Sequence, residues 1–125
     1  MNWTELEIFE GIDINDSFVL SWRVNGNELV FEIEASIWPK SIYYEKPIKS
    51  EYTCYKPAII KFSNIQDIKG LKEMSQVSPL TDSLGEKDYD SIDTLEITNE
   101  GFFLEGSFGS VSLLGGDMSF EVKET

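Results

Sequence analysis

Apolar and polar residues alternate most regularly between residues 18 and 35. Two apolar runs flank the segment Asn25-Gly26-Asn27: Phe18, Leu20, Trp22 and Val24 before it, and Leu29, Phe31, Ile33 and Ala35 after it. Alternation with a period of two is typical of a half-buried strand, and Asn-Gly is a strong hairpin signal. We therefore predict a β-hairpin with a two-residue Asn25-Gly26 turn, in which Trp22 lies opposite Leu29 and both apolar runs share one face.

The last third of the chain shows the same alternation in four short runs between Leu95 and Val122. Turn-forming residues separate the runs, at Asn99-Glu100, Gly109-Ser110 and Gly115-Gly116. This spacing predicts a meander of four antiparallel strands.

The segments outside these two regions give weaker patterns. Residues 52–62 predict another strand, in which Pro57 favours an edge position or a bulge because proline has no N–H to donate. Residues 64–71 predict one more short strand. Residues 3–9 fit either a short helix or a strand, and both readings stay open. Residues 73–91 have no sustained period and are rich in turn formers, which predicts a long loop.

These elements predict a mainly β protein. The expected architecture is an antiparallel β-sandwich or a strongly curved sheet of seven to eight strands, with one short helix as an option. A chain of 125 residues is long enough for one hydrophobic core and too short for two, so we expect a single domain spanning residues 1–125.

Charge is distributed unevenly along the chain, whose formal net charge is −13. Residues 1–39 hold eight acidic residues and one basic residue, and residues 73–125 hold twelve and two. Residues 40–72 reverse the balance, with seven lysines and three acidic residues. An acidic surface repels phosphate backbones, so we expect no nucleic-acid partner, and a basic protein is the partner that this charge favours.

Several kinds of chemistry lack their usual residues. The chain has no histidine, which removes the commonest general base and metal ligand, and no nucleophile motif is present. Cys54 is the only cysteine and lies in an apolar segment, where burial keeps a thiol inert. We expect no cofactor. We also expect no membrane association, because no apolar run approaches the length of a membrane span. A cytoplasmic location is expected because the N-terminus lacks the features of a signal peptide and the single cysteine fits a reducing compartment.

Two groups of carboxylates are candidate sites. The first group is Asp13 and Asp16, and the second is Glu86, Asp88 and Asp90. The second group suggests calcium, but its spacing lacks the glycine and the terminal glutamate of an EF-hand loop, so a solvated acidic loop is favoured. Asp13 and Asp16 form either an acid–base pair or, as we favour, a pair of turn caps.

A strip of tyrosines and lysines in the basic block is the other candidate site: Tyr43, Tyr44, Lys46, Lys49, Tyr52 and Lys56. Tyrosine faces beside positive charge are suited to anionic ligands or acidic peptides. The alternative, which we favour, is an internal charge clamp in which these lysines neutralise the neighbouring acidic sheets.

Two segments carry a resemblance, IDINDSFVLSWRVNGNELVFEIEA and GEKDYDSIDTLEI. They resemble a small family of uncharacterised bacterial proteins in which an Asp-Ser pair opens a hairpin and an acidic turn containing Asp-Tyr precedes a later strand. Size, acidity and β content are also similar to those of immunity proteins that neutralise polymorphic bacterial toxins. The resemblance implies a cytoplasmic bacterial β domain and assigns no active site.

Three functions follow as hypotheses. The first is a non-enzymatic binding module, an immunity-type inhibitor of a basic partner. The second is a carboxylate-dependent hydrolase, with or without a metal. The third is a structural domain that exposes a sheet edge to a copy of itself, because the sequence leaves the oligomeric state open.

Overall fold

The computed structural model describes residues 1–47, 53–81, 83 and 85–123 and contains two four-stranded antiparallel sheets and one two-stranded hairpin. The first sheet has the order β1-β2-β3-β10 and the second has the order β4-β9-β8-β7. The first sheet is built from β1 (Ile12–Asn25), β2 (Glu28–Ile37), β3 (Cys54–Ser63) and β10 (Asp117–Val122). The second is built from β4 (Asp67–Leu71), β7 (Ile92–Ile97), β8 (Gly101–Gly106) and β9 (Gly109–Leu114). The expectation of a mainly β fold is confirmed.

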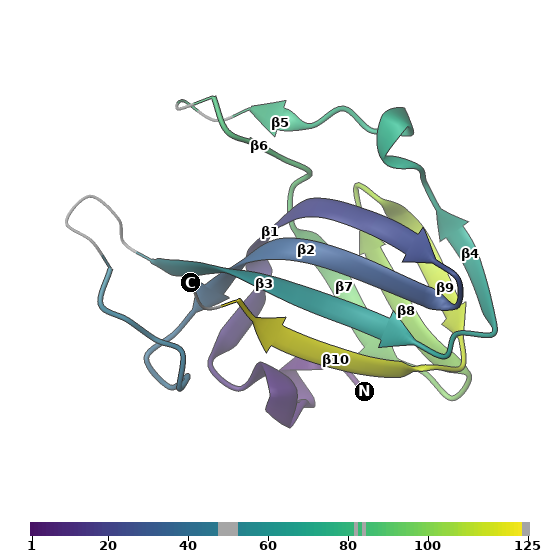
Figure 1. Cartoon of the computed structure of the whole chain (residues 1–125). Helices are drawn as coiled ribbons and strands as arrows, with labels where there is room; N and C mark the ends of the chain where they lie inside the picture. The colour runs from purple at the N-terminus through teal and green to yellow at the C-terminus, as the bar shows by residue number, and fades with distance from the viewer. Residues whose placement is uncertain (48–52, 82, 84, 124–125) are drawn as a thin grey trace.

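The two sheets pack face to face around one core, with the first sheet in front in Figure 1. Aromatic rings join them: Phe31 of β2 contacts Phe108, which precedes β9, with ring centroids 4.9 Å apart, and Phe62 of β3 contacts Phe102 of β8 at 5.1 Å. All four rings are buried. Edge-to-face aromatic pairs add to the gain from burying apolar area, so these contacts fix how the sheets stack.

The β1–β2 hairpin has a different register from the prediction. Its turn is Gly26-Asn27, Asn25 lies opposite Glu28, and Trp22 lies opposite Phe31 rather than Leu29. Gly26 has a φ of 62°, and glycine is favoured at this first central position of a II′ turn.

A bulge in β1 explains a second difference. The register shifts between Val19 and Ser21, and Val19 is buried whereas Leu20 is half-buried. The bulge reverses the inward and outward alternation, so Phe18 and Leu20 do not share the buried face of Trp22 as predicted.

Pro57 lies in a central strand, and the expected edge position is wrong for β3 as a whole, because β3 pairs with β2 on one side and with β10 on the other. The proline nevertheless marks the end of one ladder. The Lys123 N–H donates to the Pro57 carbonyl (2.8 Å), and the return bond cannot form because proline has no N–H. Pairing between β3 and β10 therefore ends at Val122.

The predicted C-terminal meander contains three strands rather than four. β7, β8 and β9 pair in sequence, whereas β10 pairs with β3 in the other sheet. Gly115 and Gly116 connect β9 to β10 with φ values of 70° and 99°, which favour glycine. This sharp corner lets the chain pass from one sheet to the other.

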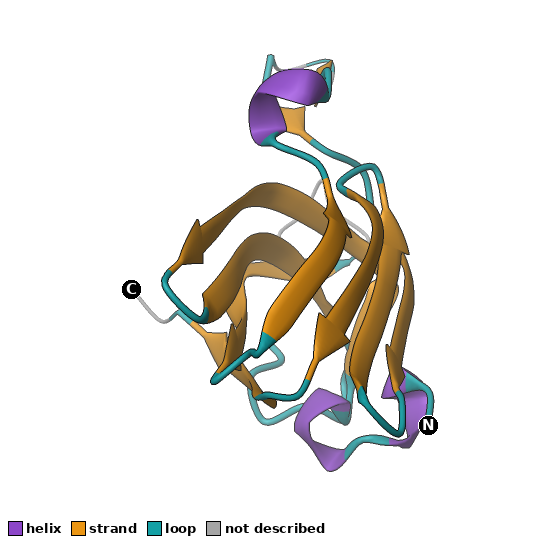
Figure 2. Ribbon diagram, turned by 90° about the vertical axis from the view of Figure 1, so that its right-hand side faces the viewer, coloured by secondary structure: helices purple, strands orange, loops and turns teal. Residues whose placement is uncertain are grey.

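Three short 3-10 turns and a small hairpin complete the fold. Residues 3–9 form η1 (Trp3–Glu5) and η2 (Glu7–Phe9), so neither a regular helix nor a strand forms there. The expected loop at residues 73–91 contains η3 (Met74–Gln76) and the hairpin of β5 (Leu80–Thr81) and β6 (Lys87–Asp88). Figure 1 shows this hairpin standing away from the two sheets, and Figure 2 shows the same projection from the side.

We expect Phe31→Ala to destabilise the protein by about 3–5 kcal/mol, because it removes a ring that touches both sheets and leaves a cavity. Val24→Ala is the matched control on the same hairpin, because Val24 is 51% exposed, and it should change stability by less than about 0.5 kcal/mol. Urea unfolding curves of the two variants test this expectation. Equal losses would show that Phe31 is not central to the packing.

Candidate functional site

The carboxylates of Asp13 and Asp16 lie in the bulged first half of β1, where they hold neighbouring strands. Asp16 Oδ2 accepts hydrogen bonds from Ser36 Oγ (3.0 Å) and from the Tyr55 hydroxyl (3.2 Å). Asp13 Oδ1 accepts from the Asp16 N–H at 3.3 Å, as a turn cap does. Asp16 therefore links β1 to β2 and β3.

Two buried serines, which were not among the predicted site residues, support the same bulge. Ser17 and Ser36 are both fully buried. Ser17 Oγ donates to the Asp13 carbonyl (2.7 Å) and accepts from the Ser36 N–H (3.0 Å), so this hydroxyl replaces regular ladder bonds. The sequence signal for this role is Ser17, a small polar residue among the apolar positions of β1. A buried hydroxyl needs hydrogen-bond partners, so such a residue indicates a polar contact inside the fold.

The second acidic group lies at the base of the projecting hairpin. Asp88 Oδ1 accepts from the Asp90 N–H (2.8 Å), and Asp90 has a φ of 67°. The carbonyl of Asp90 accepts from the Val19 N–H (2.8 Å), and the Tyr89 N–H donates to the Val19 carbonyl (2.7 Å). Residues 89 and 90 thus cover the outer edge of β1, next to its bulge. Glu86 lies exposed on the hairpin.

The side-chain amide of Asn15, which lies between Asp13 and Asp16, ties β1 to the start of β7. Asn15 Nδ2 donates to the carbonyls of Ile92 (2.9 Å) and Asp93 (3.1 Å). Within residues 1–47, 53–81, 83 and 85–123, no three His, Cys, Asp or Glu side chains are grouped so that they could hold a metal ion. The carboxylates of Asp13, Asp16 and Asp88 accept hydrogen bonds from backbone and side-chain donors of the fold.

The tyrosine and lysine strip is only partly described. Lys49 and Tyr52 lie outside the described residues. Tyr43 and Tyr44 are half-buried against the core, and Lys46 is exposed. Lys56 pairs with Glu45 (3.1 Å), an acidic residue of the same basic block.

The ion pairs between blocks involve other lysines. Lys61 lies 4.0 Å from Glu28, and Lys123 lies 3.0 Å from Glu32. These pairs connect β3 and the end of β10 to β2. Among the described lysines of the strip, Lys46 and Lys56, only Lys56 forms an ion pair, and its partner is Glu45.

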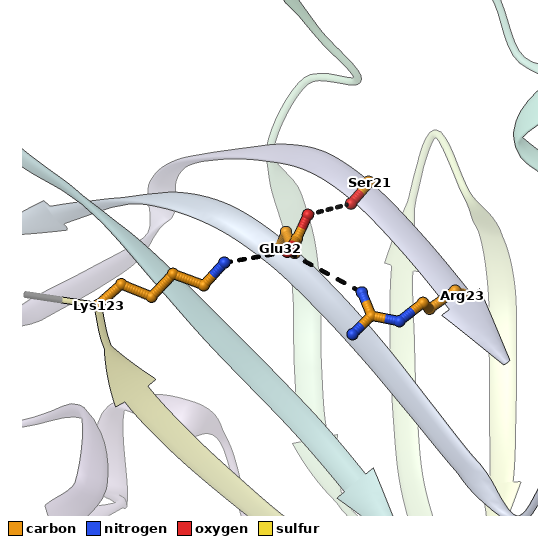
Figure 3. A network of polar contacts seen from close by, with 4 residues as sticks. All are labelled: Ser21, Arg23, Glu32 and Lys123. Atoms are coloured by element: carbon orange, nitrogen blue, oxygen red, sulfur yellow. Dashed lines mark hydrogen bonds and ion pairs between the residues drawn. The ribbon is translucent and has the colours of Figure 1, made fainter. Parts of the chain in front are cut away.

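Glu32 is the centre of a polar network on the outer face of the first sheet (Figure 3). It accepts hydrogen bonds from Lys123 Nζ (3.0 Å) and Ser21 Oγ (2.9 Å), and Arg23 lies 4.0 Å away. These interactions, the Lys123 hydrogen bond foremost, lower the pKa of Glu32 below its ordinary value of 4.5. No local sequence pattern reveals this network, because it depends on β10 joining the first sheet.

Two neighbouring hollows of about 420 and 290 Å³ lie between the N-terminal 3-10 turns and residues 38–43. Glu10, Ile12 and Lys40 line both of them. Large apolar side chains around them are exposed: Trp38 by 54%, Ile42 by 91% and Ile8 by 45%. Sequence alternation does not reveal this surface, because the segments that form it lie in irregular structure.

No family model matches the chain, and the searches of curated proteins and of solved structures also give no match. None of the helical segments in the described part of the chain has the length and apolar character that a membrane crossing requires.

The lowered pKa of Glu32 predicts an acid-sensitive contribution to stability. This contribution is fully present above pH 4.5, the ordinary value that the unfolded chain retains, and it is lost as the pH falls through the lower pKa of the folded state. We expect Glu32→Gln to be less stable than the wild type at pH 7, with a difference that shrinks in acid and in high salt because the site is partly exposed. Glu121→Gln, on the same face, is the control. A constant difference from pH 7 to pH 2, measured by urea unfolding, would contradict this expectation.

Tyr55 provides a spectroscopic test of the Asp16 contact. Burial raises the pKa of the Tyr55 hydroxyl, and the negative charge of Asp16 raises it further. We expect Asp16→Asn to make one tyrosine titrate at a lower pH than in the wild type, as measured by phenolate absorbance. The same substitution in a Tyr55→Phe background should leave the titration curve unchanged, and a shift there would assign the effect to another tyrosine.

Proposed function

We propose that this protein is a non-enzymatic binding module, an immunity-type inhibitor whose acidic surface binds a basic partner protein. The observation that carries the proposal is the acidic arm, defined as the described residues of 73–91. The arm projects from the sheets in Figure 1, and Leu80 on it is 56% exposed. Glu73, Glu86 and Asp90 are exposed on the same segment.

An exposed apolar side chain among carboxylates is suited to contact with a basic protein. The apolar group supplies area that is buried on binding, and the charges steer the partner during encounter. Opposite charge raises association rates by about 10- to 1,000-fold at low salt, which benefits an inhibitor that must reach its target quickly. A nuclease toxin is a partner of this kind, because it must be basic to hold nucleic acid.

The arrangement of the acidic residues supports binding more than hydrolysis. Asp13 and Asp16 already accept hydrogen bonds from Ser36, Tyr55 and a backbone N–H. Asp88 and Asp90 accept backbone N–H groups in their own turn. In a hydrolase we would expect two such groups to face a shared cavity, with one desolvated.

The test requires a toxin domain encoded next to the gene of this protein, and that domain should be lethal when it is expressed alone. We expect co-expression of the wild type to restore growth. Replacing Glu73, Glu86 and Asp90 by lysine should lower the association rate constant with the purified toxin by about tenfold or more at low salt. The matched control replaces Glu7, Glu10 and Glu100 by lysine, which changes the net charge equally on other exposed segments.

The control variant should associate more slowly by a smaller factor. Equal slowing of both variants would place the contact outside the arm. Failure of the wild type to restore growth, together with no basic protein recovered in a pull-down, would overturn the proposed function.

A further inference from the structure

Three of the four edges of the two four-stranded sheets are covered or interrupted. The β1 edge is bonded at Val19 by residues 89 and 90. The β7 edge is covered by Met1, whose amino group and carbonyl both bond to Ile97. β4 is short and contains Gly70, with a φ of 87° and a register shift beside it, and such irregularities weaken an edge as a pairing surface.

The fourth edge, β10, is regular, and η2 lies beside it without bonding to its backbone in the described part of the chain. The N–H of Lys123 donates to Pro57 of β3, so the backbone groups of residue 123 face β3. Backbone groups of successive residues in a strand face opposite sides, so the N–H and C=O groups of Met118, Phe120 and Val122 face away from β3. Across the described part of the chain, none of these outward groups has a hydrogen-bond partner. The strand has no bulge and no proline. It is therefore a ready template for another strand.

Partly exposed apolar side chains lie beside this edge. Phe120 is half-buried, contacts Phe9 at 5.3 Å between ring centroids, and lines the smaller hollow near η2 with Ile8 and Ile42. Ile8 is 45% exposed and Ile42 is 91% exposed. A strand added to β10 would cover Phe120 and shield part of this apolar surface.

We propose that β10 pairs antiparallel with β10 of a second copy of this chain, which joins the two first sheets into one continuous eight-stranded sheet. The two-fold axis passes at Phe120, so that this residue lies opposite Phe120 of the second copy. Met118 then lies opposite Val122 of the second copy, and all the outward backbone groups of both strands are paired.

Charge selects this register. It places Asp117 opposite Lys123 of the second copy, twice by symmetry, and it places Glu121 opposite Ser119. Within its own chain Asp117 accepts a hydrogen bond from Asn64 (3.1 Å) and Lys123 contacts Glu32 (3.0 Å), so the contacts between copies are shared with these partners. Moving the axis to Ser119 sets Asp117 against Glu121 of the second copy, and moving it to Glu121 sets the two Glu121 side chains against each other. Like charges directly opposite are destabilising, so both neighbouring registers are disfavoured.

Charge substitutions test both the edge and the register. Asp117→Lys and Lys123→Asp should each weaken the homodimer by about tenfold, because each creates two like-charge contacts. Lys123→Asp also removes the contact of Lys123 with Glu32 within each chain, so the mixture of the two variants is the decisive comparison. An equimolar mixture of the two variants should form a heterodimer about as tight as the wild type, because each chain supplies the charge that the other lacks. Asp67→Lys combined with Lys69→Asp on β4 is the control, which should leave association unchanged.

Met118→Pro tests the backbone pairing separately. Its N–H faces away from β3, so proline is compatible with the fold but blocks an added strand. Thermal unfolding establishes that each variant is folded, and sedimentation equilibrium measures the mass. The wild type should approach twice the 14.2 kDa of one chain as its concentration rises, and Met118→Pro should stay at the mass of one chain.

Three results would overturn the proposal: a wild type that is monomeric at all concentrations, dimerisation of folded Met118→Pro with wild-type affinity, or a mixture of the charge variants that associates no better than each variant alone.

The effect of salt distinguishes this proposal from the proposed function. Two chains of charge −13 repel each other, so added salt should strengthen the dimer, whereas it should weaken binding to a basic partner. Each proposal can therefore fail without the other.

Discussion

Each edge strand of the two sheets presents backbone N–H and C=O groups that must bond to water or to another segment, and much of the irregular structure follows from this constraint. Residues 89 and 90 leave the small hairpin and bond to Val19 at the edge of β1. The N-terminus does the same for β7 at Ile97. The proline in β3 sets where β10 stops pairing. Coverage of edges thus determines the course of the chain outside the sheets.

The sequence predicts the strands well because alternation is a local property, and it predicts their pairing less well because pairing depends on distant residues. The hairpin of β1 and β2 was evident, but its register was not, since the bulge near Val19 coincides with bonds from residues 89 and 90. The C-terminal strands were found with the wrong partner for β10. Nothing local distinguishes the corner at Gly115-Gly116 from a hairpin turn, because both use glycine with positive φ.

The candidate sites show the same limit. Asp13 accepts a nearby backbone N–H, as its predicted role of turn cap requires. Asp16 was predicted to be a cap as well, but its carboxylate bonds to Ser36 and Tyr55, and these bonds arise only when three strands align. The Glu32 network likewise joins residues of β1, β2 and the end of β10. The basic block was recognisable from composition, whereas the partners of its lysines depend on the fold. Lys56 bonds to Glu45 within the block, and Lys61 reaches Glu28 outside it.

Acidity and an open strand edge have opposite effects on self-association, and their combination limits what the β10 edge can do. A net charge of −13 keeps copies apart at long range, so only a short, registered contact overcomes the repulsion. Pairing of β10 with its own copy consumes both open edges at once. Because the β1 edges at the far sides of the joined sheet are already bonded by residues 89 and 90, further strands find no comparable template there. Two-fold pairing therefore gives a closed dimer rather than a growing fibre.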